Sequence, residues 1–167
     1  MLTKMRKGTF ETNSSSVHSI VIDVGSSPAP RSDIEFLCDG GEYGWGYDCL
    51  ASPSELASYL WQAVCCLCES EYYDKDEAVT FWTDAIHEWL PNAEIEYVGN
   101  RNGYDRYIDH ASELIDLLEQ FKDDDILLGC YLVNSGSFVE IYNDNEDDFR
   151  DEFSYPEGNY IFYEKGN

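Results

Sequence analysis

The segment from Ser52 to Cys68 places the strongest constraint on what this chain can fold into. Ser52 is suited to cap a helix, Pro53 suits the first turn, and Glu55 is positioned to complete a capping box. The apolar residues that follow at helical spacing are Leu56, Leu60, Ala63, Val64 and Leu67. Because such a helix must bury its apolar face, the chain has to supply a second layer of structure against it.

Hydrophobic periodicity and helix- or strand-breaking residues predict the other helices and strands. A second helix is expected from about Asp74 until Pro91 stops it, and a third is expected to open at Asp109. Alternating or β-branched segments predict strands at 17–24, 34–38, 93–99, 136–144 and 159–165. Irregular segments are expected at 25–33, 39–49 and 145–153, and 123–133 fits either a short helix or a strand. We therefore predict one α+β domain over residues 1–167, with a mostly antiparallel or mixed sheet of about five strands and about three helices.

Charge limits the kinds of partner. The chain has 34 Asp and Glu against 10 Lys and Arg, a net charge of −24, yet 15% of its 167 residues are aromatic. This aromatic content is typical of a packed core rather than a disordered acidic tail. The charge argues against direct binding to nucleic acid or to anionic lipid, and it favours basic partners. No apolar run is long enough to span a membrane, and no secretion signal is apparent, so we expect a cytoplasmic protein with reduced thiols.

Three of the ten cations lie in the first seven residues, ahead of a run of hydroxyl residues and a histidine, RKGTFETNSSSVHS. The stretch from Arg6 to Ile22 resembles the start of small, largely uncharacterised proteins of bacteriophages, prophages and other mobile elements of Gram-positive bacteria. Those proteins begin with a pattern close to K-R-G-x-F-E-T-N-S-S-S-x-H-S followed by a strand. The resemblance implies a mobile-element protein acting in a bacterial host cell, and it implies no particular activity.

Two interpretations of this motif are open. Basic side chains, a flexible glycine and hydroxyls in one loop could hold a phosphate or carboxylate. Alternatively, the cations pair with the acidic surface and the hydroxyls satisfy a turn and a strand entry. The residues concerned are Arg6, Lys7, Gly8, Asn13, Ser14, Ser16 and His18.

Enzymatic interpretations have little support. Ser16 and His18 would share one face of a strand, which permits a hydroxyl–imidazole contact, but no nucleophile-elbow motif is present. Arg6, the serines at 14–16 and the pair Glu94 and Glu96 copy the order of motifs in one class of ADP-ribosyl transferases. That class needs a strand and a helix between its Arg and its serines, which are only eight residues apart here. We expect no enzyme, no catalytic residues and no cofactor.

The cysteines favour core packing over a metal site. Cys65 and Cys68 would face one side of the predicted helix, next to Cys66. A structural zinc site usually needs a second pair of ligands. The remaining candidates, which form no second pair, are Cys38, Cys49, Cys130, His87 and His110.

Dense acidic stretches are the candidate contact surface. The predicted partner-binding residues are Asp123, Asp124, Asp125, Asp144, Glu146, Asp147, Asp148 and Asp151. They suit a solvated face, a hard-cation site, or a surface on which carboxylates take the place of phosphates. Nearby aromatic residues that could stand in for stacked bases, or fill the core instead, are Tyr43, Trp45, Tyr47, Tyr72, Tyr73, Tyr155, Tyr160 and Tyr163.

The leading hypothesis combines the charge with the resemblance. It is a phage or mobile-element inhibitor, anti-CRISPR-like, that mimics DNA and binds the basic groove of a host defence nuclease by protein–protein contact. A CRISPR effector is the first expected target because its nucleic-acid channels are basic, and a restriction enzyme is the second. The alternative is a small enzyme or an anion- or nucleotide-binding module that uses the N-terminal motif. A third class is an acidic virion or assembly protein. A homodimer is compatible with each hypothesis.

Overall fold

The computed structural model describes residues 3–6, 16–31, 42–44, 48–69, 74–97, 107–108, 114–143 and 157–165. The elements over these residues are β1 (Thr3–Arg6), β2 (Ser16–Asp23), β3 (Glu42–Tyr43), β4 (Asp48–Leu50), α1 (Pro53–Cys68), α2 (Lys75–Trp89), β5 (Tyr107–Ile108), α3 (Ile115–Asp123), α4 (Asp125–Val133), β6 (Phe138–Asn143) and β7 (Tyr160–Lys165).

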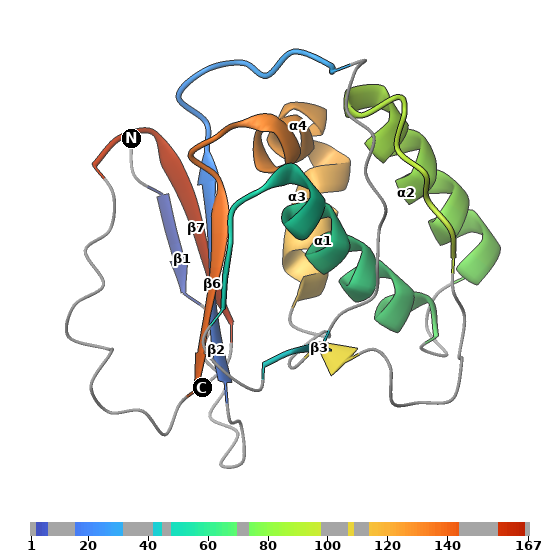
Figure 1. Ribbon diagram of the computed structural model, residues 1–167, viewed down its shortest axis with the longest axis horizontal. Helices are drawn as coiled ribbons and strands as arrows, with labels where there is room; N and C mark the ends of the chain where they lie inside the picture. The colour runs from blue at the N-terminus through green and yellow to red at the C-terminus, as the bar shows by residue number, and fades with distance from the viewer. Residues whose placement is uncertain are drawn as a thin grey trace.

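Five of the strands form one mixed sheet in the order β1-β7-β2-β6-β4. β1 runs parallel to β7, and the other neighbouring pairs are antiparallel. β2 is central, so that Ile20 lies opposite Val139 of β6 and Tyr163 of β7. The helices gather on one side of this sheet, with α2 on the far side of α1 (Figure 1). The predicted α+β class with a mixed sheet of about five strands is confirmed.

The first two helices begin where their local signals predict. The Ser52 hydroxyl accepts a hydrogen bond from the Glu55 amide at 3.3 Å, and the Glu55 carboxylate accepts from the Ser52 amide at 2.9 Å. The Asp74 carboxylate caps α2 by accepting from the Glu77 amide at 3.1 Å. Both caps satisfy amide groups that the first turn of a helix leaves without a partner.

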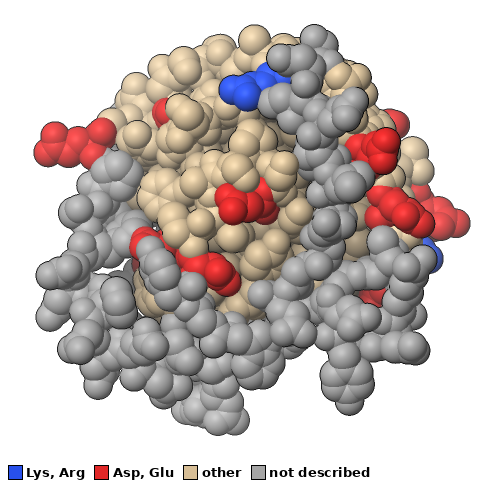
Figure 2. Space-filling view, viewed as in Figure 1, with Lys and Arg blue, Asp and Glu red and all other residues tan. Residues whose placement is uncertain are grey.

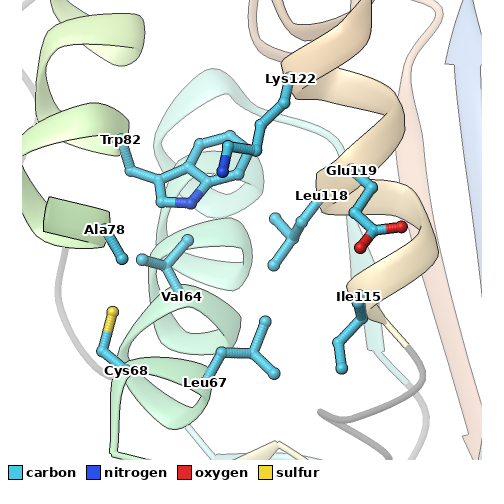
Figure 3. A pocket seen from close by; sticks show the side chains of 9 residues that line it. All are labelled: Val64, Leu67, Cys68, Ala78, Trp82, Ile115, Leu118, Glu119 and Lys122. Carbon is cyan, nitrogen blue, oxygen red and sulfur yellow. The ribbon is translucent and has the colours of Figure 1, made fainter. Parts of the chain in front are cut away.

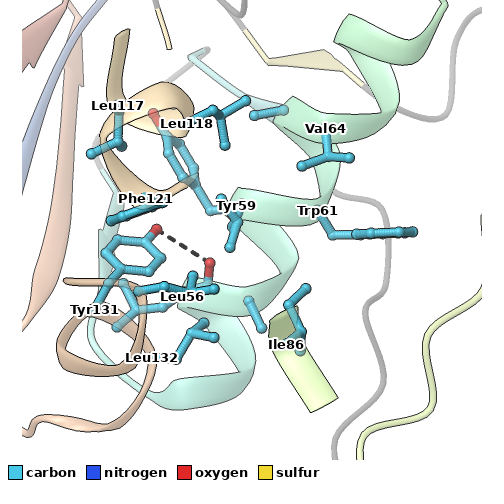
Figure 4. Close-up of a cluster of buried hydrophobic side chains, with 14 of the residues drawn as sticks. Leu56, Tyr59, Trp61, Val64, Ile86, Leu117, Leu118, Phe121, Tyr131 and Leu132 are labelled. Carbon is cyan, nitrogen blue, oxygen red and sulfur yellow. Dashed lines mark hydrogen bonds between the residues drawn. The ribbon is translucent and has the colours of Figure 1, made fainter. Parts of the chain in front are cut away.

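The core lies between the sheet and the helices. Ile20, Ile22 and Ile141 point from the sheet into the same cluster as the apolar face of α1. Phe121 and Tyr131 pack with ring centroids 5.3 Å apart, and the Tyr131 hydroxyl donates to the Leu56 carbonyl at 3.2 Å (Figure 4). This bond lets a tyrosine be buried at the centre of the core without leaving its hydroxyl unsatisfied.

The structure corrects several of the predicted elements. The expected strand at 93–99 is wrong over its described part, residues 93–97, where only Glu94 forms a single bridge. The indole of Trp61 donates to the Glu96 carbonyl at 3.1 Å, so a side chain rather than a neighbouring strand bonds this backbone group. Within 39–49, the short strands β3 and β4 replace part of the expected irregular loop.

The segment 123–133 resolves into a helix, which gives four helices over the described residues rather than about three. Asp124 decides this outcome, because its carboxylate accepts from the amides of Ile126 and Leu127 and so caps α4. The described part of the third predicted helix is α3. The expected helix start at 109–113, the strand at 34–38 and the acidic segment 145–153 lie outside the described residues. No helix of the described residues is long and apolar enough to cross a membrane.

Candidate functional site

Ser16 and His18 lie on one face of β2, as predicted, and form a buried polar chain with Tyr59 of α1. Ser16 Oγ is 3.2 Å from His18 Nε2, and His18 Nδ1 is 2.8 Å from the Tyr59 hydroxyl. Ser16 and His18 are 0% exposed, and Tyr59 is 1% exposed. Each ring nitrogen of the histidine therefore has a hydroxyl beside it that is able to donate or accept.

Other side chains close this chain off from solvent. Lys165 of β7 lies opposite His18 in the sheet, is itself buried, and places its ammonium 5.7 Å from the centre of the Tyr59 ring. Tyr43 packs edge-on against Tyr59 at 5.2 Å between ring centroids. Tyr43 is thus a buried core residue rather than an exposed aromatic contact.

The geometry favours a structural role for Ser16 and His18. A serine nucleophile needs a carboxylate to orient its histidine and an approach for substrate. The group beside His18 Nδ1 is the Tyr59 phenol, and burial raises the pKa of the Tyr59 hydroxyl well above 10, so the phenol stays neutral. Ser16 and His18 are also inaccessible to an anion, which removes them as direct contacts in the alternative hypothesis of an anion-binding loop.

Of the remaining motif residues, the structure describes only the backbone of Arg6. Arg6 ends β1, where its backbone lies in register with Glu164 of β7. Lys7, Gly8, Asn13 and Ser14 lie outside the described residues.

The acidic triplet occupies the junction of α3 and α4. Asp123, Asp124 and Asp125 are all exposed, and Asp124 also caps α4. The structure brings these three predicted contact residues together. The other five predicted contacts, Asp144, Glu146, Asp147, Asp148 and Asp151, lie outside the described residues.

The acidic residues of α2 extend this surface. Lys122, at the end of α3, places its ammonium 4.7 Å above the centre of the Phe81 ring, which sets the middle of α2 beside the triplet. Spacings of four, three and four residues put one carboxylate before Phe81 and two after it on the same exposed side of α2. We call the following group the α2–α3 acidic surface: Glu77, Phe81, Asp84, Glu88, Asp123, Asp124 and Asp125.

Sequence reasoning missed the α2 part of this surface. The helical spacing of Glu77, Asp84 and Glu88 was the available signal, but the contact between Lys122 and Phe81 that brings α2 near the triplet is a tertiary one. Phe81 and Ile126 are the large hydrophobic residues exposed among those described, at 36% and 55%. One belongs to the α2–α3 acidic surface and the other follows the triplet directly.

Carboxylates dominate the rest of the described surface as well. Over all the described residues, sixteen Asp and Glu are exposed, six of them in the α2–α3 acidic surface, against three exposed cations, which are Arg31, Lys75 and Lys122. On the face that Figure 2 shows, the carboxylates form several separate groups, and Lys and Arg occupy small areas. The surface would thus present negative charge to a partner from many directions of approach.

The cysteines described by the structure do not form a cluster of metal ligands. Cys65, Cys68 and Cys130 are buried. His87, one of the other candidate ligands, hydrogen-bonds the Ala93 carbonyl through Nε2 at 2.8 Å. The part of the chain that the structure describes has no group of three His, Cys, Asp or Glu side chains placed to hold a metal ion. Cys38 and His110 lie outside it.

Comparisons of this chain with protein-family models, with curated proteins and with solved structures found no match.

Proposed function

We propose that this chain is a non-enzymatic inhibitor that binds a basic, nucleic-acid-binding groove of another protein. The observation that carries the proposal is the excess of exposed carboxylates over exposed cations, sixteen to three, on the described surface. A protein groove that holds nucleic acid is lined with Lys and Arg, because it must neutralise phosphates. Exposed carboxylates on a folded body complement such a groove.

The α2–α3 acidic surface is the proposed contact region. It combines carboxylates with the exposed ring of Phe81, and Ile126 lies next to it. Charge alone mainly raises the association rate, whereas apolar side chains that become buried slow dissociation. A surface carrying both can bind quickly and be retained.

The class of target comes from the resemblance of the N-terminal segment to mobile-element proteins. A mobile element benefits from blocking a host defence nuclease, and a CRISPR effector with its basic channels is the first candidate. A restriction enzyme is the second. In either case, the inhibitor would act in the host cytoplasm without contacting nucleic acid itself.

The test is a competition assay with purified candidate nucleases. DNA cleavage is measured with increasing amounts of the chain, at low and at raised salt. We expect inhibition to weaken as the salt concentration rises. We also expect weaker inhibition by the double variant Asp123→Asn/Asp125→Asn, which leaves the Asp124 cap of α4 in place. Asp48→Asn/Glu157→Gln is the matched control, because it removes the same charge from exposed positions outside α2, α3 and α4.

Equal inhibition by both double variants would show that only overall charge matters and would remove the α2–α3 acidic surface from the proposal. Inhibition that is unchanged between low and high salt would contradict the proposal itself. So would a lack of inhibition of nucleases of both candidate classes.

A further inference from the structure

A small groove opens between α1, α2 and α3, and we call it the apolar groove. Its cavity is about 70 Å³. Figure 3 shows apolar side chains from the three helices directed toward one another around it, which are Val64, Leu67, Trp82 and Leu118. An apolar protein cavity that holds benzene measures ~150 Å³. The apolar groove is therefore too small for most free ligands, and it suits the end of a single aliphatic side chain.

The apolar groove adjoins the α2–α3 acidic surface. Lys122 lines the groove, and its ammonium lies 4.7 Å above the centre of the Phe81 ring. Phe81 packs edge-on against Trp82, one of the groove walls, at 5.2 Å between ring centroids. Phe81 is also the exposed apolar residue of the α2–α3 acidic surface. A protein that covers Phe81 would therefore lie beside the mouth of the apolar groove.

The charge around the apolar groove is mainly negative. The two stretches that supply its α2 and α3 lining, 74–82 and 115–123, each carry three exposed carboxylates and one exposed lysine. Of these, Glu119 and Lys122 belong to the lining itself. Lys and Arg on a partner complement such surroundings, whereas an acidic segment is repelled. The groove therefore favours an aliphatic side chain that is presented among basic residues.

We propose that the apolar groove receives one aliphatic side chain of the protein bound by the α2–α3 acidic surface, from a segment with Lys or Arg on both sides of that side chain. This inference rests on the proposed function, because it takes the acidic surface as a protein-binding surface. Insertion would remove apolar surface of both proteins from water. Residues that fill a pocket in this way dominate the binding energy of an interface, whereas exposed charge pairs contribute little.

The apolar groove would thus select among basic partners. Negative charge attracts many basic surfaces and has little specificity of its own. Only a surface that presents an aliphatic side chain at the matching place gains the contact with the groove. Discrimination between two basic partners is then the difference between their binding free energies.

The first test compares two leucine substitutions in α2. Ala78 lines the apolar groove, and Ala85, further along the same helix, lies outside the lining. Both alanines are partly buried against the core, so the same replacement is matched for its effect on packing. In the nuclease competition assay, we expect Ala78→Leu to weaken inhibition roughly tenfold by filling the groove, and Ala85→Leu to change it less than about twofold. Melting temperatures show whether both variants are folded.

The second test needs no nuclease. The full chain is titrated with a short peptide of Lys, Arg and Ala that carries one central Leu, and with a control peptide that has Ala in place of the Leu. Methyl NMR observes the lining directly, at Val64, Leu67, Ile115 and Leu118. We expect only the Leu peptide to shift these methyl resonances saturably. Both peptides should shift the amide resonances of the α2–α3 acidic surface, which responds to charge alone.

Two results would overturn the inference and leave the proposed function in place. They are inhibition by Ala78→Leu and Ala85→Leu that both equal the parent chain, and a Leu peptide that shifts only the amides of the α2–α3 acidic surface. If the parent chain inhibited no candidate nuclease, the proposed function would be wrong, and the peptide titration alone would support or contradict the groove. The peptide titration also decides the matter if Ala78→Leu proves unfolded.

Discussion

His18 Nδ1 and the Tyr59 hydroxyl lie 2.8 Å apart, although 41 positions separate the two residues in the chain. The contact joins the central strand β2 to α1 inside the core. It shows that the histidine of the N-terminal motif is held by a tertiary partner that no local pattern indicates. The hydrogen bond also explains how a polar side chain is accommodated at a position with no solvent access.

Tyr59→Phe should destabilise the protein. The change keeps the ring and removes the hydroxyl beside His18 Nδ1, so a buried polar group loses a partner at a cost of about 1–3 kcal/mol. Urea denaturation followed by circular dichroism would measure the loss. Tyr160→Phe is the control, because Tyr160 is only partly buried and its ring, rather than its hydroxyl, contacts Phe162. Equal stability of Tyr59→Phe and the parent chain would contradict the structural role of the buried polar chain.

Ser52→Ala should cost about 1 kcal/mol, because it removes the hydroxyl that caps α1. Ser54→Ala provides the comparison, since Ser54 is exposed within the first turn and holds no capping position. Thermal melting of the two variants would separate the cap from the general effect of replacing a serine. If the two changes were equally costly, the capping box would not be the source of the stability.

The stability contributed by Glu55 should depend on pH. Hydrogen bonds from the amides of Ser52 and Ala51 lower the pKa of the Glu55 carboxyl below its usual 4.5. A carboxyl whose pKa is lower in the folded state adds stability above its unfolded pKa and loses it as the pH falls through the folded pKa. The stability difference between the parent and Glu55→Ala should therefore be present at pH 7 and shrink below about pH 4.5. A constant difference across this range would argue against the ionised cap.

Gly129→Ala should lower the stability of the protein, although alanine favours helices, because it disturbs the packing of α4 against Trp89 of α2. An added Cβ would lie 2.6 Å from the nearest ring atoms of Trp89, which is too close for either group to keep its place. Overpacking of this kind costs about 1–3 kcal/mol. Trp89→Leu in the Gly129→Ala background should recover part of the loss, and a double-mutant cycle would measure the coupling. If the effects of the two changes on the free energy of unfolding were additive, the Cβ added at position 129 would not clash with the Trp89 ring.

The exposed thiol of Cys49 should be alkylated more slowly than an equally exposed thiol of ordinary pKa. Partial burial raises its pKa above 9.0, and the charges of Glu140 and Glu55 raise it further. Because the thiolate is the reactive form, Glu140→Gln should speed alkylation of Cys49 at neutral pH. The rate would be followed with iodoacetamide and peptide mapping. Glu157→Gln, which removes an exposed charge before β7, should leave the rate unaltered, and a matching increase in that variant would indicate a general charge effect.

Local sequence determined the starts of α1 and α2, the central strand and the fold class. Ser52, Glu55 and Asp74 accept hydrogen bonds from amides within four residues of themselves, so their effects can be predicted without knowing the rest of the fold. The alternation at 17–24 likewise predicts β2 because one strand position in two must face the core. Net charge follows from composition alone, and with it the expectation of a basic partner.

Only the tertiary structure decided where these residues meet. The segment after α2 alternates like a strand, yet Trp61 bonds the backbone of Glu96 and no ladder forms over the described residues. The Ser16 and His18 pattern predicts a shared face, but not that α1 buries that face beneath Tyr59. The proximity of Phe81 to Lys122, which creates both the α2–α3 acidic surface and one edge of the groove, depends on helix packing. Such contacts join residues distant in the chain, and their energies arise only once the elements are assembled.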